Sequence, residues 1–139
     1  LIGAYKPEGY EWVDELKEVL SGNINYACDY IEKHFEGIHV SKPEGTYMLF
    51  LDCTEWCQKH GKSITELQAA GIEVGVIWQD GVAFHGPCHI RMNLALPFSR
   101  VKEAFERLDK YVFNKLFRYC AYTMISIRCR WSVLIVSGK

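Results

Sequence analysis

Apolar and polar residues alternate most clearly over residues 89–96, HIRMNLAL. The apolar positions of this segment are Ile90, Met92, Leu94 and Leu96. A period of two is typical of a strand that has one buried face. The pattern therefore predicts a strand over 89–96, with Arg91 on the face opposite the apolar side chains.

Two further segments are predicted to form strands. Residues 46–52, TYMLFLD, are rich in aromatic and aliphatic side chains and follow a Pro- and Gly-containing turn at 40–45. Residues 71–78, GIEVGVIW, are short and apolar and precede a glycine-containing segment at 79–87. Runs of this composition between turn residues favour strands, and 79–87 is expected to be a loop.

The N-terminal region shows the helical period instead. It predicts a helix over 8–20, a break at Ser21-Gly22-Asn23, and a second helix over 23–36 that ends at Gly37. The expected inward residues are Trp12, Leu16, Val19 and Leu20 in the first helix, and Ile24, Ala27, Ile31 and Phe35 in the second.

Three more helices are predicted downstream. A short helix lies near 54–60, and a second runs from Ser63 to Ala70, because Ser63 and Glu66 have the spacing of a capping box. Ser99 is expected to cap an amphipathic helix over 100–113. The inward residues of that last helix are expected to be Val101, Ala104, Phe105, Leu108 and Val112.

Strands interleaved with helices predict an α/β class fold, an α+β sandwich in which a small mixed β-sheet is covered by helices. The chain of 139 residues is long enough for a single domain with its own core. The tail over 115–139 differs in character, being mostly β-branched and aromatic. It has possible strands at 122–127 and 131–136, which together would form a terminal hairpin.

Charge and composition exclude several classes of partner. Lys and Arg total 16 against 17 Asp and Glu, without a basic run, so no nucleic-acid partner is expected. No apolar stretch reaches the length of a membrane span, so no membrane partner is expected. The six cysteines lack the dense spacing of a disulfide framework. Reduced, mostly buried thiols and a cytoplasmic location are therefore expected.

Arg91 is the leading candidate for chemistry. A guanidinium is always charged, and its planar fork matches the two oxygens of a carboxylate. Placed on a strand after a glycine-rich loop, Arg91 is suited to bind a small acid. The alternative is a structural role, in which Arg91 is paired with Asp52 or Glu73 inside the fold.

Three segments resemble one known family. They are KPEGTYMLFLD (42–52), GVAFHGPCHIRMNLALP (81–97) and SRVKEAFERLDKYV (99–112). Together they resemble the C-terminal small domain of fold-type-I pyridoxal-phosphate (PLP) enzymes of the class I/II aminotransferase family, nearest to the cystathionine β-lyase-like C–S lyases. The helical region 10–35 is similar to the helices that lead from the large domain into the small one.

The resemblance implies a division of the chain and of its chemistry. Residues 1–36 would be linking helices from a large domain, 37–114 the small domain, and 115–139 a tail without a family match. Arg91 would bind the α-carboxylate of an amino-acid substrate, with Phe84, His85 and Gly86 in a loop near that substrate. The full-length enzyme would be a PLP-dependent homodimer.

The resemblance also implies limits for this chain alone. The family's Schiff-base lysine and most of its other cofactor ligands belong to the large domain, so this chain is expected to bind no PLP and to be inactive by itself. Lyase and aminotransferase activities are not distinguished here. A free-standing binding module and a non-functional gene fragment stay open as alternatives.

A zinc-binding domain is a remoter alternative. It would use two short motifs that contain the metal-binding residue types. These candidate ligands are Cys53, Cys57, His60, His85, Cys88 and His89. However, the Cys-x3-Cys spacing is looser than that of a zinc knuckle, and cysteines on apolar faces usually act as small hydrophobic residues.

Overall fold

The computed structural model describes residues 5–113 of the chain. Four α-helices and four short strands make up most of this part. The elements are α1 (Pro7–His34), β1 (His39–Val40), β2 (Met48–Asp52), α2 (Thr54–His60), α3 (Ile64–Glu73), β3 (Gln79–Asp80), the 3-10 turn η2 (Val82–Phe84), β4 (His89–Asn93), α4 (Phe98–Leu108) and the π-helical turn η3 (Asp109–Phe113). The predicted tail strands at 122–127 and 131–136 lie outside the described residues.

The N-terminal region forms one continuous helix, α1, so the predicted break at 21–23 is wrong. Gly22 lies within the helix and is exposed, and a glycine there costs only about 1 kcal/mol. Asn23 is buried, and its Nδ2 donates to the carbonyl oxygens of Leu94 at 2.9 Å and Leu96 at 2.8 Å. These bonds hold the chain that leaves β4 against α1, and they favour a helix through Asn23.

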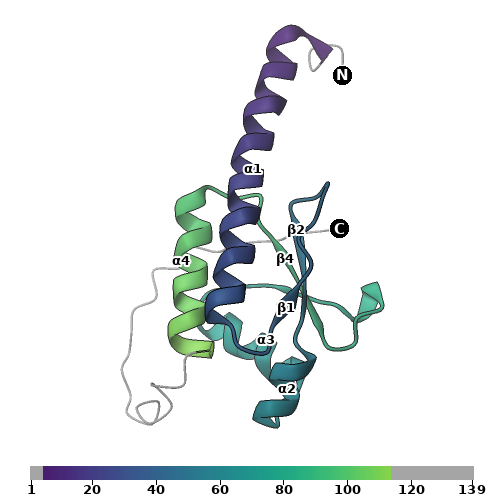
Figure 1. The fold of residues 1–139 in the computed structure, drawn as a ribbon, viewed down its shortest axis with the longest axis vertical. Helices are drawn as coiled ribbons and strands as arrows, with labels where there is room; N and C mark the ends of the chain where they lie inside the picture. Colours follow the sequence, from purple (N-terminus) through teal and green to yellow (C-terminus); the bar gives the residue numbers. More distant parts are fainter. Residues whose placement is uncertain (1–4, 114–139) are drawn as a thin grey trace.

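The two halves of α1 differ in burial, and the N-terminal half projects beyond the rest of the described fold (Figure 1). Trp12 is 62% exposed and Val19 is 50% exposed, so the predicted inward positions of these two residues are wrong. Leu16 and Leu20 are half-buried. The buried residues of α1 are Asn23, Ile24, Ala27 and Ile31. The apolar period thus continues along a helix of which only the C-terminal half meets the core.

The described strands form a four-stranded sheet in the order β1-β2-β4-β3. Every pair of described strands is antiparallel. The prediction of a mixed sheet is therefore wrong. The alternation in β2 and β4 is confirmed, because each strand buries every second side chain. The side chains of the buried face are Leu49, Leu51, Ile90 and Met92.

Helices cover the buried face of this sheet. Figure 1 shows α1 and α4 side by side on one side of the sheet. Phe105 and Leu108 of α4 join Ile31 of α1 and the strand residues in one hydrophobic cluster. The opposite face bears Phe50 and Arg91, which keep part of their surface exposed. A small sheet with helices, as predicted, is confirmed.

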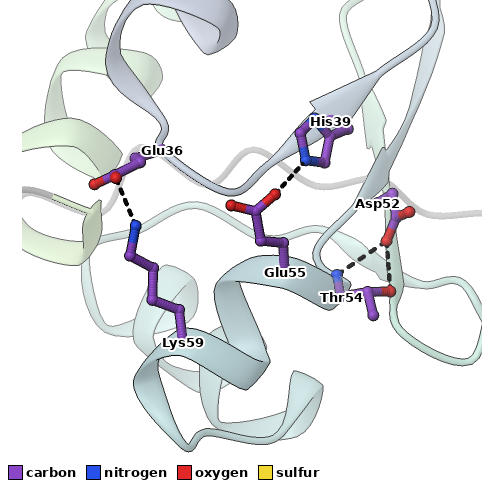
Figure 2. Close-up of polar contacts among 6 residues, drawn as sticks. All are labelled: Glu36, His39, Asp52, Thr54, Glu55 and Lys59. Atoms are coloured by element: carbon purple, nitrogen blue, oxygen red, sulfur yellow. Dashed lines mark hydrogen bonds and ion pairs between the residues drawn. The ribbon is translucent and has the colours of Figure 1, made fainter.

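Polar contacts hold α2 beside the end of α1 and the first two strands (Figure 2). Lys59 Nζ lies 2.5 Å from Glu36 Oε1, and His39 Nε2 lies 2.8 Å from Glu55 Oε2. Both pairs are well exposed, and such pairs each contribute at most about 1 kcal/mol. The buried Trp56 and Cys57 of α2 therefore supply more of its attachment to the core.

Helix α3 begins as the sequence predicts and ends later. The capping box is confirmed, with Ser63 accepting from the backbone of Glu66 and Glu66 accepting from the backbone of Ser63. The predicted strand over 71–78 is wrong, because α3 continues to Glu73 and Gly75 ends it with φ of 80°. Only Gln79–Asp80 then pair with β4. Once a helix is formed, each added residue gains one hydrogen bond. This gain outweighs the preference of a short apolar run for a strand.

Helix α4 starts at Phe98 after Pro97, and no side-chain cap bond is formed, so the predicted cap by Ser99 is wrong. Four of the five residues predicted inward are buried, namely Val101, Ala104, Phe105 and Leu108, whereas Val112 lies in η3 and is half-buried. Among the described residues, no helix is long and apolar enough to cross a bilayer.

Candidate functional site

Arg91 lies at the middle of the sheet, on the face opposite α1 and α4. In the register, Phe50 of β2 and Gln79 of β3 flank it on the neighbouring strands. Its chain neighbours Ile90 and Met92 are buried beneath the helices, whereas Arg91 is half-buried. Strand pairing on both sides fixes the backbone of Arg91, so the direction of its side chain is set by the sheet.

The contacts of the Arg91 guanidinium are to uncharged groups. Nη1 donates to Gln79 Oε1 at 3.0 Å. Cζ lies 4.5 Å from the centroid of the Phe84 ring, in a cation–π contact. Within residues 5–113, no carboxylate lies in ion-pair range of Arg91. The positive charge is therefore not neutralised by the described part of the chain.

Asp52, one of the two acids expected in a structural role, is engaged elsewhere. Its Oδ1 accepts from the hydroxyl of Thr54 at 2.6 Å and from the backbone N–H of Thr54 at 2.9 Å (Figure 2). The hydroxyl bond, followed by the backbone bond, lowers the pKa of Asp52 from its ordinary value of 3.8 despite partial burial. An internal pair of Arg91 with Asp52 or Glu73 is thus contradicted in the described structure.

The loop between β3 and β4 folds back on itself through its own backbone. Gly81 accepts from the N–H of Phe84 at 2.9 Å and of Gly86 at 3.0 Å, and it donates to His89 O at 2.9 Å. A Cβ on Gly81 would lie 2.6 Å from His89 O, and one on Gly86 would lie 2.5 Å from the Phe50 ring. Both glycines are required by close approach, and the resulting loop holds Phe84 over Arg91.

The three loop residues predicted near a substrate have different positions. Phe84 contacts Arg91 directly. His85 is exposed and has a left-handed backbone with φ of 60°, which is uncommon for a residue other than glycine. Gly86 is buried against the rings of Phe50 and His89. The structure therefore brings together Phe84 and Arg91, while Gly86 shapes the loop.

Sequence reasoning missed two members of this site. Gln79 was expected in the loop, but it is the strand residue that binds Arg91. Phe50 is 37% exposed and stacks on the ring of His89, with centroids 4.7 Å apart. Phe50 lies at an outward position of an alternating strand, which was a usable signal. No signal in the sequence could have shown that Gln79 pairs with Arg91, because this pairing depends on strand order.

The residues around Arg91 do not provide a PLP site by themselves. A PLP enzyme needs a lysine that forms a Schiff base with the cofactor. None of the described strands carries a lysine, and neither does the loop over 81–88. The described lysines lie on helices or in other turns, for example Lys59, which is paired with Glu36. The site therefore offers a guanidinium for an anionic group but no amine for a Schiff base.

The zinc alternative is contradicted in the described residues. No group of three or more His, Cys, Asp or Glu side chains in this part of the chain could hold a metal ion. His60 donates from Nδ1 to Trp56 O at 2.8 Å and stacks on the Trp56 ring. Cys53 and Cys57 are both buried within the hydrophobic cluster.

A separate open groove lies between α1 and the turn that precedes β2. Its volume is about 760 Å³, and Lys17, Lys42 and Tyr47 are among its lining residues. Neither Arg91 nor its contact residues line this groove. The described feature of the candidate site is therefore an unneutralised charge on a sheet face, which lies outside this groove.

Similarity to known proteins agrees with this architecture. Aspartate aminotransferase of Bacillus sp. (strain YM-2) is 36% identical over 78 residues, which cover 55% of this chain and 20% of that protein. Cystathionine beta-lyase PatB of Bacillus subtilis is 26% identical over 110 residues, which cover 77% of this chain and 27% of that protein. No family model matches the chain.

Among solved structures, cystalysin from Treponema denticola, which contains a PLP cofactor, superposes with a TM-score of 0.67 at 27% identity. The match covers 78% of this chain and 27% of cystalysin. The chain thus spans less than a third of each of these proteins. The predicted resemblance is confirmed: this chain is similar to the small domain of class I/II aminotransferases and C–S lyases, which are PLP enzymes of fold type I.

Proposed function

We propose that this chain is the part of a PLP-dependent C–S β-lyase or aminotransferase that binds the α-carboxylate of an amino-acid substrate through Arg91. The observation that carries the proposal is the Arg91 guanidinium, held on a sheet face with only uncharged partners among the described residues. A half-buried cation without a counter-ion favours an anionic ligand, because that ligand offsets the loss of solvation.

The geometry leaves donors available for that ligand. A guanidinium has five N–H donors, and the bond to Gln79 Oε1 uses one of them. The Phe84 ring lies against the guanidinium and restricts its movement. A charged hydrogen-bonded pair of this kind contributes about 1.5–3 kcal/mol. Such a pair would orient the substrate, while PLP and the lysine that holds it would come from elsewhere in a longer protein.

The exposed N-terminal half of α1 supports a link to a large domain at the start of the proposed linking residues 1–36, which precede the proposed small domain over 37–114. Trp12 and Val19 present apolar surface that no described residue covers. In the full-length protein, a large domain would cover this surface, and the enzyme would be a homodimer like those the resemblance implies. A cytoplasmic location stays a prediction.

The proposal is tested in a chimeric enzyme. This chain replaces the matching segment of Treponema denticola cystalysin, and KM for an amino-acid substrate is measured with Arg91→Lys and with the control Arg100→Lys. Arg100 is an exposed residue of α4 that pairs with Glu103 at 3.0 Å. Losing the fork at Arg91 should raise KM at least about tenfold, equal to about 1.4 kcal/mol. Equal KM values for both variants would refute the proposal.

If the chimera lacks activity, the isolated chain still tests the binding step. The guanidinium signal of Arg91 is followed by nuclear magnetic resonance while acetate or L-alanine is added. A shift confined to Arg91 supports carboxylate binding. It would also favour the second candidate, a free-standing module that binds carboxylated metabolites, since the described chain alone leaves the charge unneutralised.

A further inference from the structure

Gln79 accepts the hydrogen bond that fixes the direction of the Arg91 guanidinium. Oε1 of Gln79 lies 3.0 Å from Arg91 Nη1, and the two residues are directly opposite each other in the register of β3 and β4. Directly opposed residues of an antiparallel pair present their side chains on the same face of the sheet. The bond therefore joins two half-buried side chains whose backbones are already fixed by strand pairing.

The position of Gln79 is set by the residue before it. Trp78 is 6% exposed, and its Nε1 donates to Gln68 O of α3 at 3.3 Å. The Trp78 ring also lies directly against Gly71 of the same helix. These contacts anchor the start of β3, which has only two residues. The amide of Gln79 is thus held beside Arg91 by the packing of the core.

The bond to Gln79 leaves one edge of the guanidinium available. Nε and Nη2 lie along the same edge of the guanidinium plane, and Nη1 lies outside that edge. In the part of the chain that the structure describes, neither Nε nor Nη2 of Arg91 donates a hydrogen bond. This edge presents two parallel N–H donors, the arrangement that matches the two oxygens of a carboxylate.

The Gln79 side chain is uncharged, which matters as much as its position. An amide oxygen accepts a hydrogen bond without cancelling the charge of the guanidinium, whereas a carboxylate in its place would form an ion pair and compete with an anionic ligand. A long side chain loses rotamer freedom when it binds a ligand, and one that is ordered beforehand loses less. Gln79 therefore orders Arg91 and keeps its charge available.

We infer that Gln79 is a positioning residue, which holds Nη1 of Arg91 so that the Nε/Nη2 edge is presented to the carboxylate of an amino acid. This role rests on the proposed function of Arg91. It adds the residue that orients the guanidinium and the edge to which the ligand binds. In this arrangement Gln79 acts through Arg91 and not on the ligand.

The test uses the full chain and L-alanine as the probe, and the guanidinium signals of Arg91 are followed by nuclear magnetic resonance. Without L-alanine, the bond to Gln79 should slow the rotation of the guanidinium and give Arg91 separate Nη1 and Nη2 signals. Added L-alanine should shift the Nε and Nη2 signals more than the Nη1 signal, because the ligand binds the other edge.

Two substitutions at Gln79 separate orientation from charge. Gln79→Met keeps an unbranched side chain of similar length, but its sulfur is only a weak acceptor. The Nη signals should merge, and the dissociation constant for L-alanine should rise about two- to tenfold, because Arg91 must now be ordered on binding. Gln79→Glu keeps the shape and the bond, so the Nη signals should stay separate. Its charge should nevertheless weaken L-alanine binding at least about tenfold.

Gln58→Glu is the matched control, because Gln58 is an exposed residue of α2 and makes no contact with Arg91. This variant should bind L-alanine as the unaltered chain does. An unchanged affinity in Gln79→Met or in Gln79→Glu would overturn the role of Gln79 and leave that of Arg91 intact, as would a shift that is largest at Nη1. If Arg91 of the unaltered chain does not respond to L-alanine, both roles fail. If Gln79→Met does not fold, Gln79→Glu and the shifts in the unaltered chain still decide the question.

Discussion

Replacing Gly71 by alanine tests how α3 sets the position of β3. A Cβ at Gly71 would lie 2.5 Å from Cε2 and 2.6 Å from Cζ2 of the Trp78 ring. That ring is 6% exposed, and its Nε1 donates to Gln68 O at 3.3 Å. The added methyl group therefore cannot be accommodated unless the indole moves. Trp78 directly precedes Gln79, so its displacement would also disturb the amide that binds Arg91.

The magnitude follows from opposing terms. Alanine is favoured over glycine within a helix by about 1 kcal/mol. Overpacking of a filled core costs about 1–3 kcal/mol, and a weakened Trp78 hydrogen bond costs about 1 kcal/mol more. Gly71→Ala should therefore lower the free energy of unfolding by about 1–3 kcal/mol. The control, Gly22→Ala, has no atom within 4 Å of the new Cβ and should raise it by about 0.5–1 kcal/mol.

The two variants are compared by urea unfolding of the isolated chain, followed by circular dichroism at the helical band. Opposite signs of the change in unfolding free energy, with the same dependence on urea concentration, are the expected result. If Gly71→Ala stabilised the chain as much as Gly22→Ala, then Trp78 would not pack on α3 as described. In that case, packing of Trp78 on α3 would not be what positions Gln79 beside Arg91.

Two further predictions concern Asp52 and His85. Because the Thr54 hydroxyl lowers the pKa of Asp52 below 3.8, this carboxylate stabilises the fold above its ordinary pKa, and the effect is lost as pH falls through the lowered value. Thr54→Val should therefore reduce the loss of stability between pH 5 and pH 2 seen in urea titrations, and an unchanged acid limb would contradict this. His85→Gly should raise the unfolding free energy by up to about 1 kcal/mol, because glycine adopts φ of 60° without strain. If thermal unfolding shows a clear loss of stability instead, the imidazole makes a contact that the fold needs.

Local sequence patterns correctly predicted much of the fold. The alternation in 89–96 correctly placed Ile90 and Met92 inside and Arg91 outside, because side chains of a strand point to alternate faces whatever the strand pairs with. The capping box at Ser63 located the start of α3. The period of α4 identified its buried residues. Each of these signals depends on neighbours within a few positions.

The errors arose where a distant contact outweighed a local preference. The composition around Asn23 predicts a helix break. However, the side-chain amide of Asn23 donates hydrogen bonds to two carbonyl groups more than 70 residues away, and the helix α1 continues through it. Residues 71–73 read as a strand by composition, but the capped helix α3 extends through them and buries Gly71 against Trp78. The helical period predicts Trp12 as a core residue, yet the residue is 62% exposed in the described structure.

The sequence alone determined that one arginine lies on the polar face of an alternating strand after a glycine-rich loop, and its motifs predicted the resemblance to the aminotransferase small domain. Only the tertiary structure decided that the neighbours of Arg91 are Gln79 and Phe84 and not Asp52, and that the backbone of Cys53 pairs with that of Cys88. The physical reason is the same in both cases. Strand order and register bring together residues whose separation in the chain carries no information about their contact, whereas periodicity reports only which face each residue occupies.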